Sequence, residues 1–149
     1  MSIESLASFE CVELEGESYD LRREHNAICE AEQNGCEVFR GDSHTLVFDL
    51  DSEEARDTFL SRCDFLRSKF GMTHLLITKS TGGNYHAVAE LHESLHLTQE
   101  LALVIQACLG SDWKKELLGA LRKLHYNAGD SLLFRPKVLE VVYEWRVDQ

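Results

Sequence analysis

Two aspartates follow a short apolar run with one residue between them, in the segment Phe48-Asp49-Leu50-Asp51. Alternate residues of a β-strand lie on the same face, so this spacing places both carboxylates together at a strand end. Neighbouring carboxylates repel each other unless a cation offsets their charge, and such oxygen ligands suit Mg²⁺ or Mn²⁺. A pair of these ions can activate phosphoryl transfer. A second interpretation stays open, because Asp51 with Glu54 three residues later also matches a helix capping box.

A glycine-containing segment, Ser80-Thr81-Gly82-Gly83-Asn84-Tyr85-His86, follows further along the chain. Its hydroxyls, its two glycines and its backbone N–H groups are of the kind that hold phosphate oxygens. The alternative is an ordinary hairpin connection with a packed or surface histidine. The segment and the aspartates flank one strand–helix–strand unit, which favours neighbouring strands. The loop and the carboxylates would then meet at the same end of the sheet.

The spacing of apolar residues and turn signals predicts the elements that must position these groups. Helices are expected at 18–34, 53–70, 98–109 and 112–124, and strands at 36–40, 45–50, 74–78, 85–91, 132–134 and 139–147. The first two strands flank a turn and predict a hairpin. The helices at 98–109 and 112–124 are expected to bury Leu101, Val104, Ile105 and Cys108, and Trp113, Leu117, Leu121 and Leu124, respectively. Alternation predicts one buried and one wet face for the last strand.

The composition indicates one domain over residues 1–149, of the α+β class, with a mixed, mostly antiparallel sheet packed on helices. No apolar run is long enough to span a membrane, and the start lacks the features of a secretory signal. We therefore expect an intracellular, cytoplasmic protein. The net charge of −11 argues against non-specific nucleic-acid binding by the whole surface. Residues 110–137, however, carry six basic and three acidic residues, which predicts solvated helix faces or a phosphate-binding patch.

The two motifs, with a helix between them, resemble those of the archaeo-eukaryotic primase superfamily. The first motif of that superfamily is a hydrophobic-Asp-x-Asp strand end, as at Asp49 and Asp51. The second is Ser-x-Gly-x-x-x-His, which Ser80 and His86 match in spacing, although many relatives have a second glycine where Asn84 stands. The spacing is closest to the polymerase domain of bacterial end-joining ligases and to small phage or plasmid primase-like proteins. The resemblance covers roughly residues 36–137.

The resemblance implies an RRM-like core with two divalent ions, Mg²⁺ or Mn²⁺, held by acidic residues. The third motif of the superfamily is a further acid, for which Asp112 is the candidate and Asp130 a weaker substitute. Ser111 or Asp112 can equally be the cap of the helix at 112–124. The implied catalytic residues are Asp49, Asp51 and His86, with Asp112 as a third metal ligand. The implied nucleotide-binding residues are Lys79, Ser80, Thr81, Gly82, Gly83, His86 and Arg122, and the run Phe134-Arg135-Pro136-Lys137 lies where relatives often place basic residues.

The function implied by the resemblance is metal-dependent nucleotidyl transfer on nucleic acid, in a primase–polymerase-like protein of phage or mobile-element origin. A 3′-hydroxyl would attack the α-phosphate of a nucleoside triphosphate. The expected partners are that nucleotide, a nucleic-acid template and other replication proteins. A non-catalytic accessory with the same fold, binding nucleic acid or protein, is the alternative, which the acidic surface favours. A metal-dependent nuclease using the same carboxylates is a third hypothesis.

Overall fold

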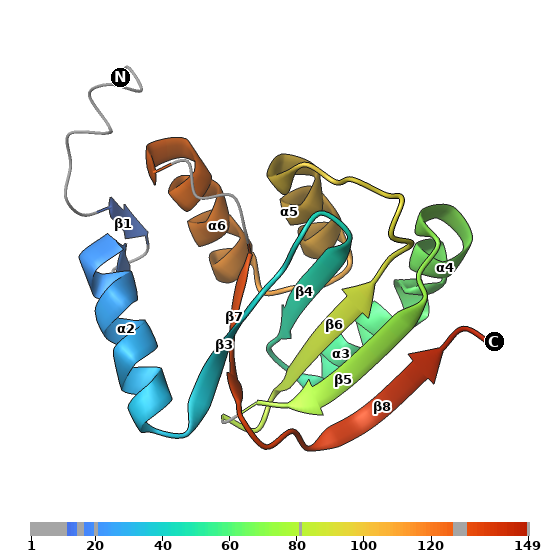
Figure 1. Ribbon diagram of the computed structural model, residues 1–149, viewed down its shortest axis with the longest axis horizontal. Coiled ribbons are helices and arrows are strands. Elements are labelled where there is room, and N and C mark those ends of the chain that lie inside the picture. The colour runs from blue at the N-terminus through green and yellow to red at the C-terminus, as the bar shows by residue number, and fades with distance from the viewer. Residues whose placement is uncertain (1–11, 15–16, 20, 81, 127–130, 149) are drawn as a thin grey trace.

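The computed structural model describes residues 12–14, 17–19, 21–80, 82–126 and 131–148. Its largest sheet contains β4 (Thr45–Leu50), β5 (His74–Lys79), β6 (Tyr85–Glu90) and β8 (Val141–Arg146), in the order β4-β6-β5-β8 (Figure 1). Every neighbouring pair is antiparallel. The predicted α+β class with antiparallel strands is therefore confirmed. The expectation that β4 and β5 are neighbours is wrong, because β6 lies between them and pairs with both.

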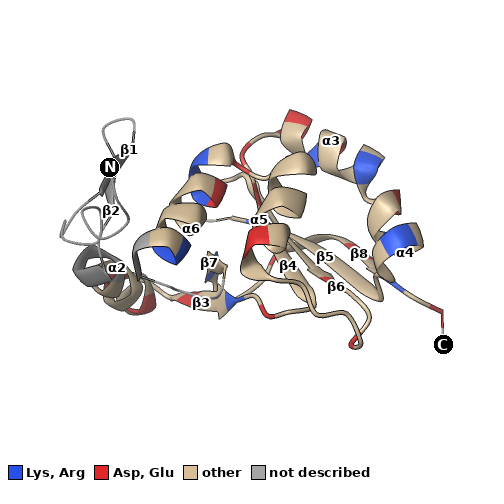
Figure 2. Cartoon of the chain, turned by 90° about the horizontal axis from the view of Figure 1, so that it is seen from above, with Lys and Arg blue, Asp and Glu red and all other residues tan. Residues whose placement is uncertain are grey.

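Three helices cover one face of this sheet, α3 (Glu53–Arg62), α4 (Asp64–Phe70) and α5 (Gln99–Cys108), and α6 (Trp113–Tyr126) lies beside α5 (Figure 2). The alternation of the strands turns Phe48, Ile77 and Ala87 toward α3, α4 and α5, where they form the main core with Phe59 and other apolar residues. The helix predicted at 53–70 is two consecutive helices. The apolar stripe that the sequence predicts here is confirmed, because its residues join the core or pack against it: Ala55, Phe59, Cys63, Leu66 and Phe70.

A separate pair of strands consists of β3 (Cys36–Arg40) and β7 (Leu132–Pro136). Strands β3 and β4 both occur where the sequence predicts them. The prediction that they form a hairpin is wrong, because β3 pairs with β7 and β4 pairs with β6. Phe39 and Leu133 lie opposite each other in the β3–β7 pair and pack on Val47 and Val88 of the large sheet. The β3–β7 pair therefore covers part of the face that the helices leave uncovered.

The N-terminal part contains β1 (Val12–Leu14), β2 (Glu17–Tyr19) and α2 (Leu21–Gln33). The predicted helix at 18–34 thus starts three residues later, because residues 17–19 pair with β1. The sequence also predicts a turn at 127–130, and this segment lies outside the described residues. Within the described parts of the chain, no helix is long and apolar enough to cross a membrane.

The faces predicted for the last helices and the last strand are largely wrong. The α5 helix buries Ala102, Ile105, Gln106 and Leu109, whereas Leu101, Val104 and Cys108 are exposed. In α6, Trp113, Leu117 and Leu124 are exposed, and the buried side chains include Glu116 and Arg122. Strand β8 is at the sheet edge, where fewer neighbours cover its side chains. On the face predicted to be buried, Val141, Tyr143 and Val147 are exposed, and Trp145 packs against the core.

Candidate functional site

Asp49 and His86 face each other across the paired strands β4 and β6. The Nε2 atom of His86 lies 3.9 Å from Oδ1 of Asp49, and Thr78 of β5 pairs with His86 on its other side. Alternation places these side chains on the face opposite the main core, next to Val47 and Val88. The predicted meeting of the first aspartate with the histidine is therefore confirmed, through β6 rather than through neighbouring β4 and β5.

The environment shifts both ionisable groups toward their neutral forms. Burial, then the charges of Asp112 and Asp51, raise the pKa of Asp49 to about 6. Burial, followed by the charges of Lys115 and Arg135, lowers the pKa of His86 to about 4. Near pH 7 the pair is thus an ionised carboxylate beside a neutral imidazole. Among the described residues, the Nδ1 atom of that buried imidazole has no hydrogen-bond partner.

Asp112, the candidate third acid, lies against Asp49 through its backbone. The N–H of Asp112 donates to the backbone oxygen of Asp49 at 2.7 Å, and Oγ of Ser111 accepts the N–H of Asp49 at 3.0 Å. The connection between α5 and α6 therefore runs along the free edge of β4. The N–H of Glu116 donates to the backbone oxygen of Asp112, so Asp112 also stands at the start of α6. The two interpretations of Asp112, third acid and helix start, are compatible.

Asp51 does not cap helix α3. Ser52 is the N-cap, and its hydroxyl accepts the N–H of Ala55 at 3.0 Å. The capping-box interpretation of Asp51 is therefore wrong. The carboxylate of Asp51 is exposed, and its charge reaches Asp49, whose pKa it helps to raise.

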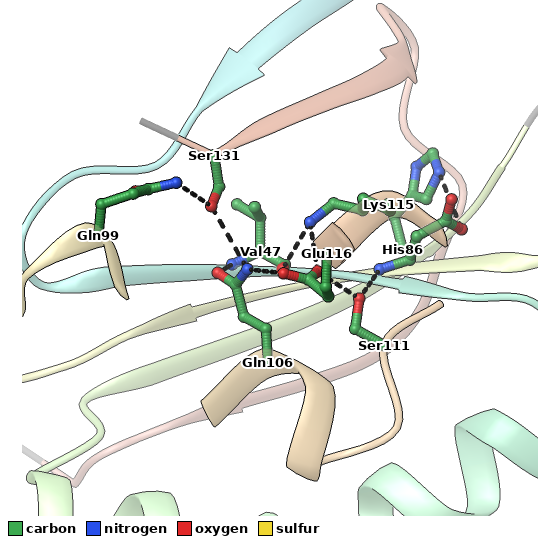
Figure 3. A network of polar contacts seen from close by, with 9 residues as sticks. Val47, His86, Gln99, Gln106, Ser111, Lys115, Glu116 and Ser131 are labelled. Carbon is green, nitrogen blue, oxygen red and sulfur yellow. Dashed lines mark hydrogen bonds and ion pairs between the residues drawn. The ribbon is translucent and has the colours of Figure 1, made fainter. Parts of the chain in front are cut away.

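A buried polar network completes the edge of β4 (Figure 3). The side chain of Gln106 accepts the N–H of Val47 at 3.1 Å, and Nζ of Lys115 donates to the backbone oxygen of Val47 at 3.3 Å. Glu116, only 5 % exposed, accepts from Gln106, Ser111 and Lys115 at 2.7, 2.8 and 2.7 Å. Gln106 also reaches Ser131, which precedes β7.

Sequence reasoning missed Gln106 and Glu116. The signal was present for Gln106: Ala102, Ile105, Gln106 and Leu109 have the spacing of a helix face that packs on a sheet. A glutamine in that series indicates a polar partner in the core, because a buried amide needs hydrogen bonds. Of the apolar stripe predicted instead, Ile105 is buried, whereas Leu101, Val104 and Cys108 are exposed.

The glycine segment closes the turn between β5 and β6, as the hairpin interpretation expected. The N–H of Ser80 donates to the oxygen of Asn84, and the N–H of Gly83 donates to the oxygen of Ser80. Two of the N–H groups proposed for phosphate binding are thus used inside the hairpin. Lys79 lies with its Nζ 5.5 Å from the centre of the Tyr85 ring, and Gly82 is exposed. Thr81 lies outside the described residues.

The basic residues of the C-terminal part have different places. Arg122 is buried in α6 and interacts with other groups of the protein. The Nε atom of Arg135 in β7 donates to Oε1 of Glu37 at 2.9 Å. The Cζ atom of the same side chain lies 4.3 Å from the centre of the Phe39 ring. Its charge reaches His86, whereas the nucleotide-binding role of Arg122 stays a prediction. The alternative third acid, Asp130, lies outside the described residues.

Metal-binding geometry is not preformed in the part of the chain that the structure describes. No three side chains of the His, Cys, Asp and Glu types are placed there as ligands of one metal ion. The acidic residues share an environment, but binding one ion would require Asp51 and Asp112 to turn toward Asp49. Asp51 is exposed and Asp112 half-buried, so both can change rotamer.

Comparison with known proteins gives no assignment. No protein-family model matches this chain, and neither curated proteins nor solved structures match it. The case for a function therefore depends on the residues and their arrangement.

Proposed function

We propose that this protein is a primase–polymerase-like nucleotidyltransferase that binds a nucleoside triphosphate with Mg²⁺ or Mn²⁺. The observation that carries the proposal is the position of Asp112. Sixty-three residues after Asp49 in the sequence, it donates its N–H to the backbone oxygen of Asp49, which in turn faces His86. Two aspartates of one motif, the histidine of the second and an acid further along the chain thus share one environment.

The order of the strands supports the same proposal. The chain order is β4, then helices α3 and α4, then β5 and β6, then helices α5 and α6, and finally β7. In space, β7 contacts β4, which is followed by β6 and β5. This order matches that of a β-α-β-β-α-β unit and so supports an RRM-like core, although β7 is hydrogen-bonded to β3 and not to β4. The side chains of Asp49 and His86 lie on the face of the sheet opposite its helices.

The donor set suits a hard divalent cation. Asp49, Asp51 and Asp112 offer carboxylate oxygens. Burial, and then the charges of Asp112 and Asp51, raise the pKa of Asp49, and a bound cation would offset the repulsion between these charges. When bound, the ion would lower the pKa of the attacking hydroxyl and neutralise the pyrophosphate that leaves. The chain itself would keep the imidazole of His86 neutral and oriented, ready to donate or accept a hydrogen bond at a phosphate oxygen.

A non-catalytic accessory of the same fold is the alternative, and two observations favour it. Among the described residues no ligand set is preformed, and the net charge of −11 disfavours a nucleic-acid template. Such a protein would bind nucleic acid or a replication protein without binding nucleotide and metal together.

Calorimetric titration of Mn²⁺, with and without a nucleoside triphosphate, separates these functions. We expect the wild type to bind Mn²⁺ saturably, with an affinity that the nucleotide increases. In the double variant Asp49→Asn/Asp51→Asn, the Mn²⁺ affinity should be at least about tenfold lower. The matched control Glu30→Gln/Glu32→Gln removes two exposed charges from α2 and should bind as the wild type does. Primer extension would then test catalysis. Absence of nucleotide-enhanced binding in the wild type would refute the catalytic proposal.

A further inference from the structure

The free edge of β4 has hydrogen-bonding groups that no strand satisfies. In the β4–β6 ladder, Phe48 and its alternate neighbours bond to β6, so Val47 and Asp49 direct their N–H and C=O groups away from it. Three side chains and one backbone N–H from α5, α6 and their connection satisfy all four groups. The edge of the sheet is thus closed by polar side chains instead of by another strand.

Glu116 connects all three of these side chains. Its Oε1 accepts from Ser111 and Lys115, and its Oε2 accepts from Gln106. The three hydrogen bonds are short, at 2.7, 2.8 and 2.7 Å. A buried carboxyl group is costly unless its oxygens are hydrogen-bonded, and the three donors around Glu116 meet that need.

We propose that Glu116 is a positioning residue, which holds Ser111 and Lys115 against β4 and thereby keeps Asp112 beside Asp49. The inference rests on the proposed function, because the pair that it holds is the candidate metal-binding pair. Ser111 is bonded on one side to Asp49 and on the other to Glu116, and Asp112 directly follows it. The like charges of Asp49 and Asp112 repel each other, so without a brace the α5–α6 connection would move away from β4.

The test is Glu116→Gln, which preserves shape but places an amide donor among three donors. Backbone hydrogen exchange, measured by NMR without metal, reports the brace directly. We expect at least tenfold faster exchange at the amides of Asp49 and Asp112, with no change at Phe48, which bonds to β6. Mn²⁺ affinity in the presence of nucleotide should fall by about 10- to 100-fold, as for other residues behind metal ligands. Glu100→Gln, on the exposed side of α5, should change neither quantity.

Ser111→Ala and Ser111→Thr form a second pair of variants, for use if Glu116→Gln does not fold. The alanine variant should lose Mn²⁺ affinity, and the threonine variant, which restores the hydroxyl, should recover it. Wild-type Mn²⁺ affinity in Glu116→Gln or Ser111→Ala would overturn the inference while leaving the proposed function intact. Failure of the wild type to bind Mn²⁺ with nucleotide would instead defeat the proposed function, and the exchange rates would still decide whether Glu116 braces the edge.

Discussion

Replacing Asp49 by asparagine should stabilise the protein at neutral pH. Burial, with the charges of Asp112 and Asp51, raises the pKa of Asp49 from 3.8 to about 6. The folded state therefore holds the proton more tightly than the unfolded chain does, and this favours folding at low pH. That contribution is lost as the pH rises from about 4 through 6, so above pH 6 the ionised carboxylate destabilises the fold. Asparagine keeps the shape and removes the charge.

The size of the effect follows from the shift and the exposure of the side chain. Two pKa units correspond to at most about 3 kcal/mol in the free energy of unfolding. The carboxylate is 34 % exposed, so solvent screening reduces the expected gain to about 1–2 kcal/mol. For a chain of this size the midpoint of thermal unfolding should rise by about 3–6 °C. At pH 4.5 wild-type Asp49 is mostly protonated in the folded state, so most of the difference should vanish.

Urea and thermal unfolding of Asp49→Asn and wild type, at pH 7.5 and 4.5 with a metal chelator present, measure this effect. Glu32→Gln removes an exposed charge from α2 and is the control for net charge. A gain at pH 7.5 that disappears at pH 4.5 supports the reasoning. An equal gain at both pH values, or a loss at pH 7.5, would refute it. Excess Mn²⁺ with nucleotide should stabilise only the wild type, through binding to its folded state.

Two further predictions concern the neighbouring histidine and the glycines. Burial, and next the charge of Lys115, lower the pKa of His86 to about 4, so the unfolded state takes up its proton first and stability falls as the pH drops from 6.5 to 4. Between pH 7.5 and 4.5, the free energy of unfolding of His86→Leu should therefore fall by roughly 2 kcal/mol less than that of the wild type. Urea titrations measure this difference, and equal falls for the two proteins would contradict the prediction. Gly71→Ala should cost about 2 kcal/mol, because φ is 62° and the new Cβ would lie 3.1 Å from Cβ of His92. Gly83→Ala, with φ of 86° and open space, should cost only about 1 kcal/mol, so the reverse order in thermal unfolding would be inconsistent with the close contact.

Local patterns predicted the positions of most helices and strands, and they predicted that Asp49 and His86 lie close together. Strand β4 occurs at 45–50 and strand β3 at 36–40, as their apolar residues and turn signals indicated. Their pairing was not predictable in the same way, because β3 finds its partner β7 almost a hundred residues later. Periodicity states which residues share a face of a strand. It does not state which other strand lies alongside.

The inner face of α5 was mispredicted for a related reason. Val104 is more apolar than Gln106, and a pattern based on hydrophobicity therefore turns Val104 inward. The structure has the opposite arrangement, because the N–H of Val47 at the edge of β4 needs an acceptor that only a polar side chain offers. The requirement comes from the sheet, so the sequence of the helix alone does not reveal it.

The closed edge of β4 also explains how the third acid reaches the first. Strand β7 contacts β4 but pairs with β3. If β7 instead paired with β4, its backbone would take the N–H and C=O groups of Val47 and Asp49, and the α5–α6 connection would lose its place along that edge. Asp112 would then lose its hydrogen bond to the backbone oxygen of Asp49. An edge completed by side chains and by one backbone N–H is thus the feature that lets a distant acid join the strand-end aspartates, and Glu116 at its centre is the residue on which this arrangement depends.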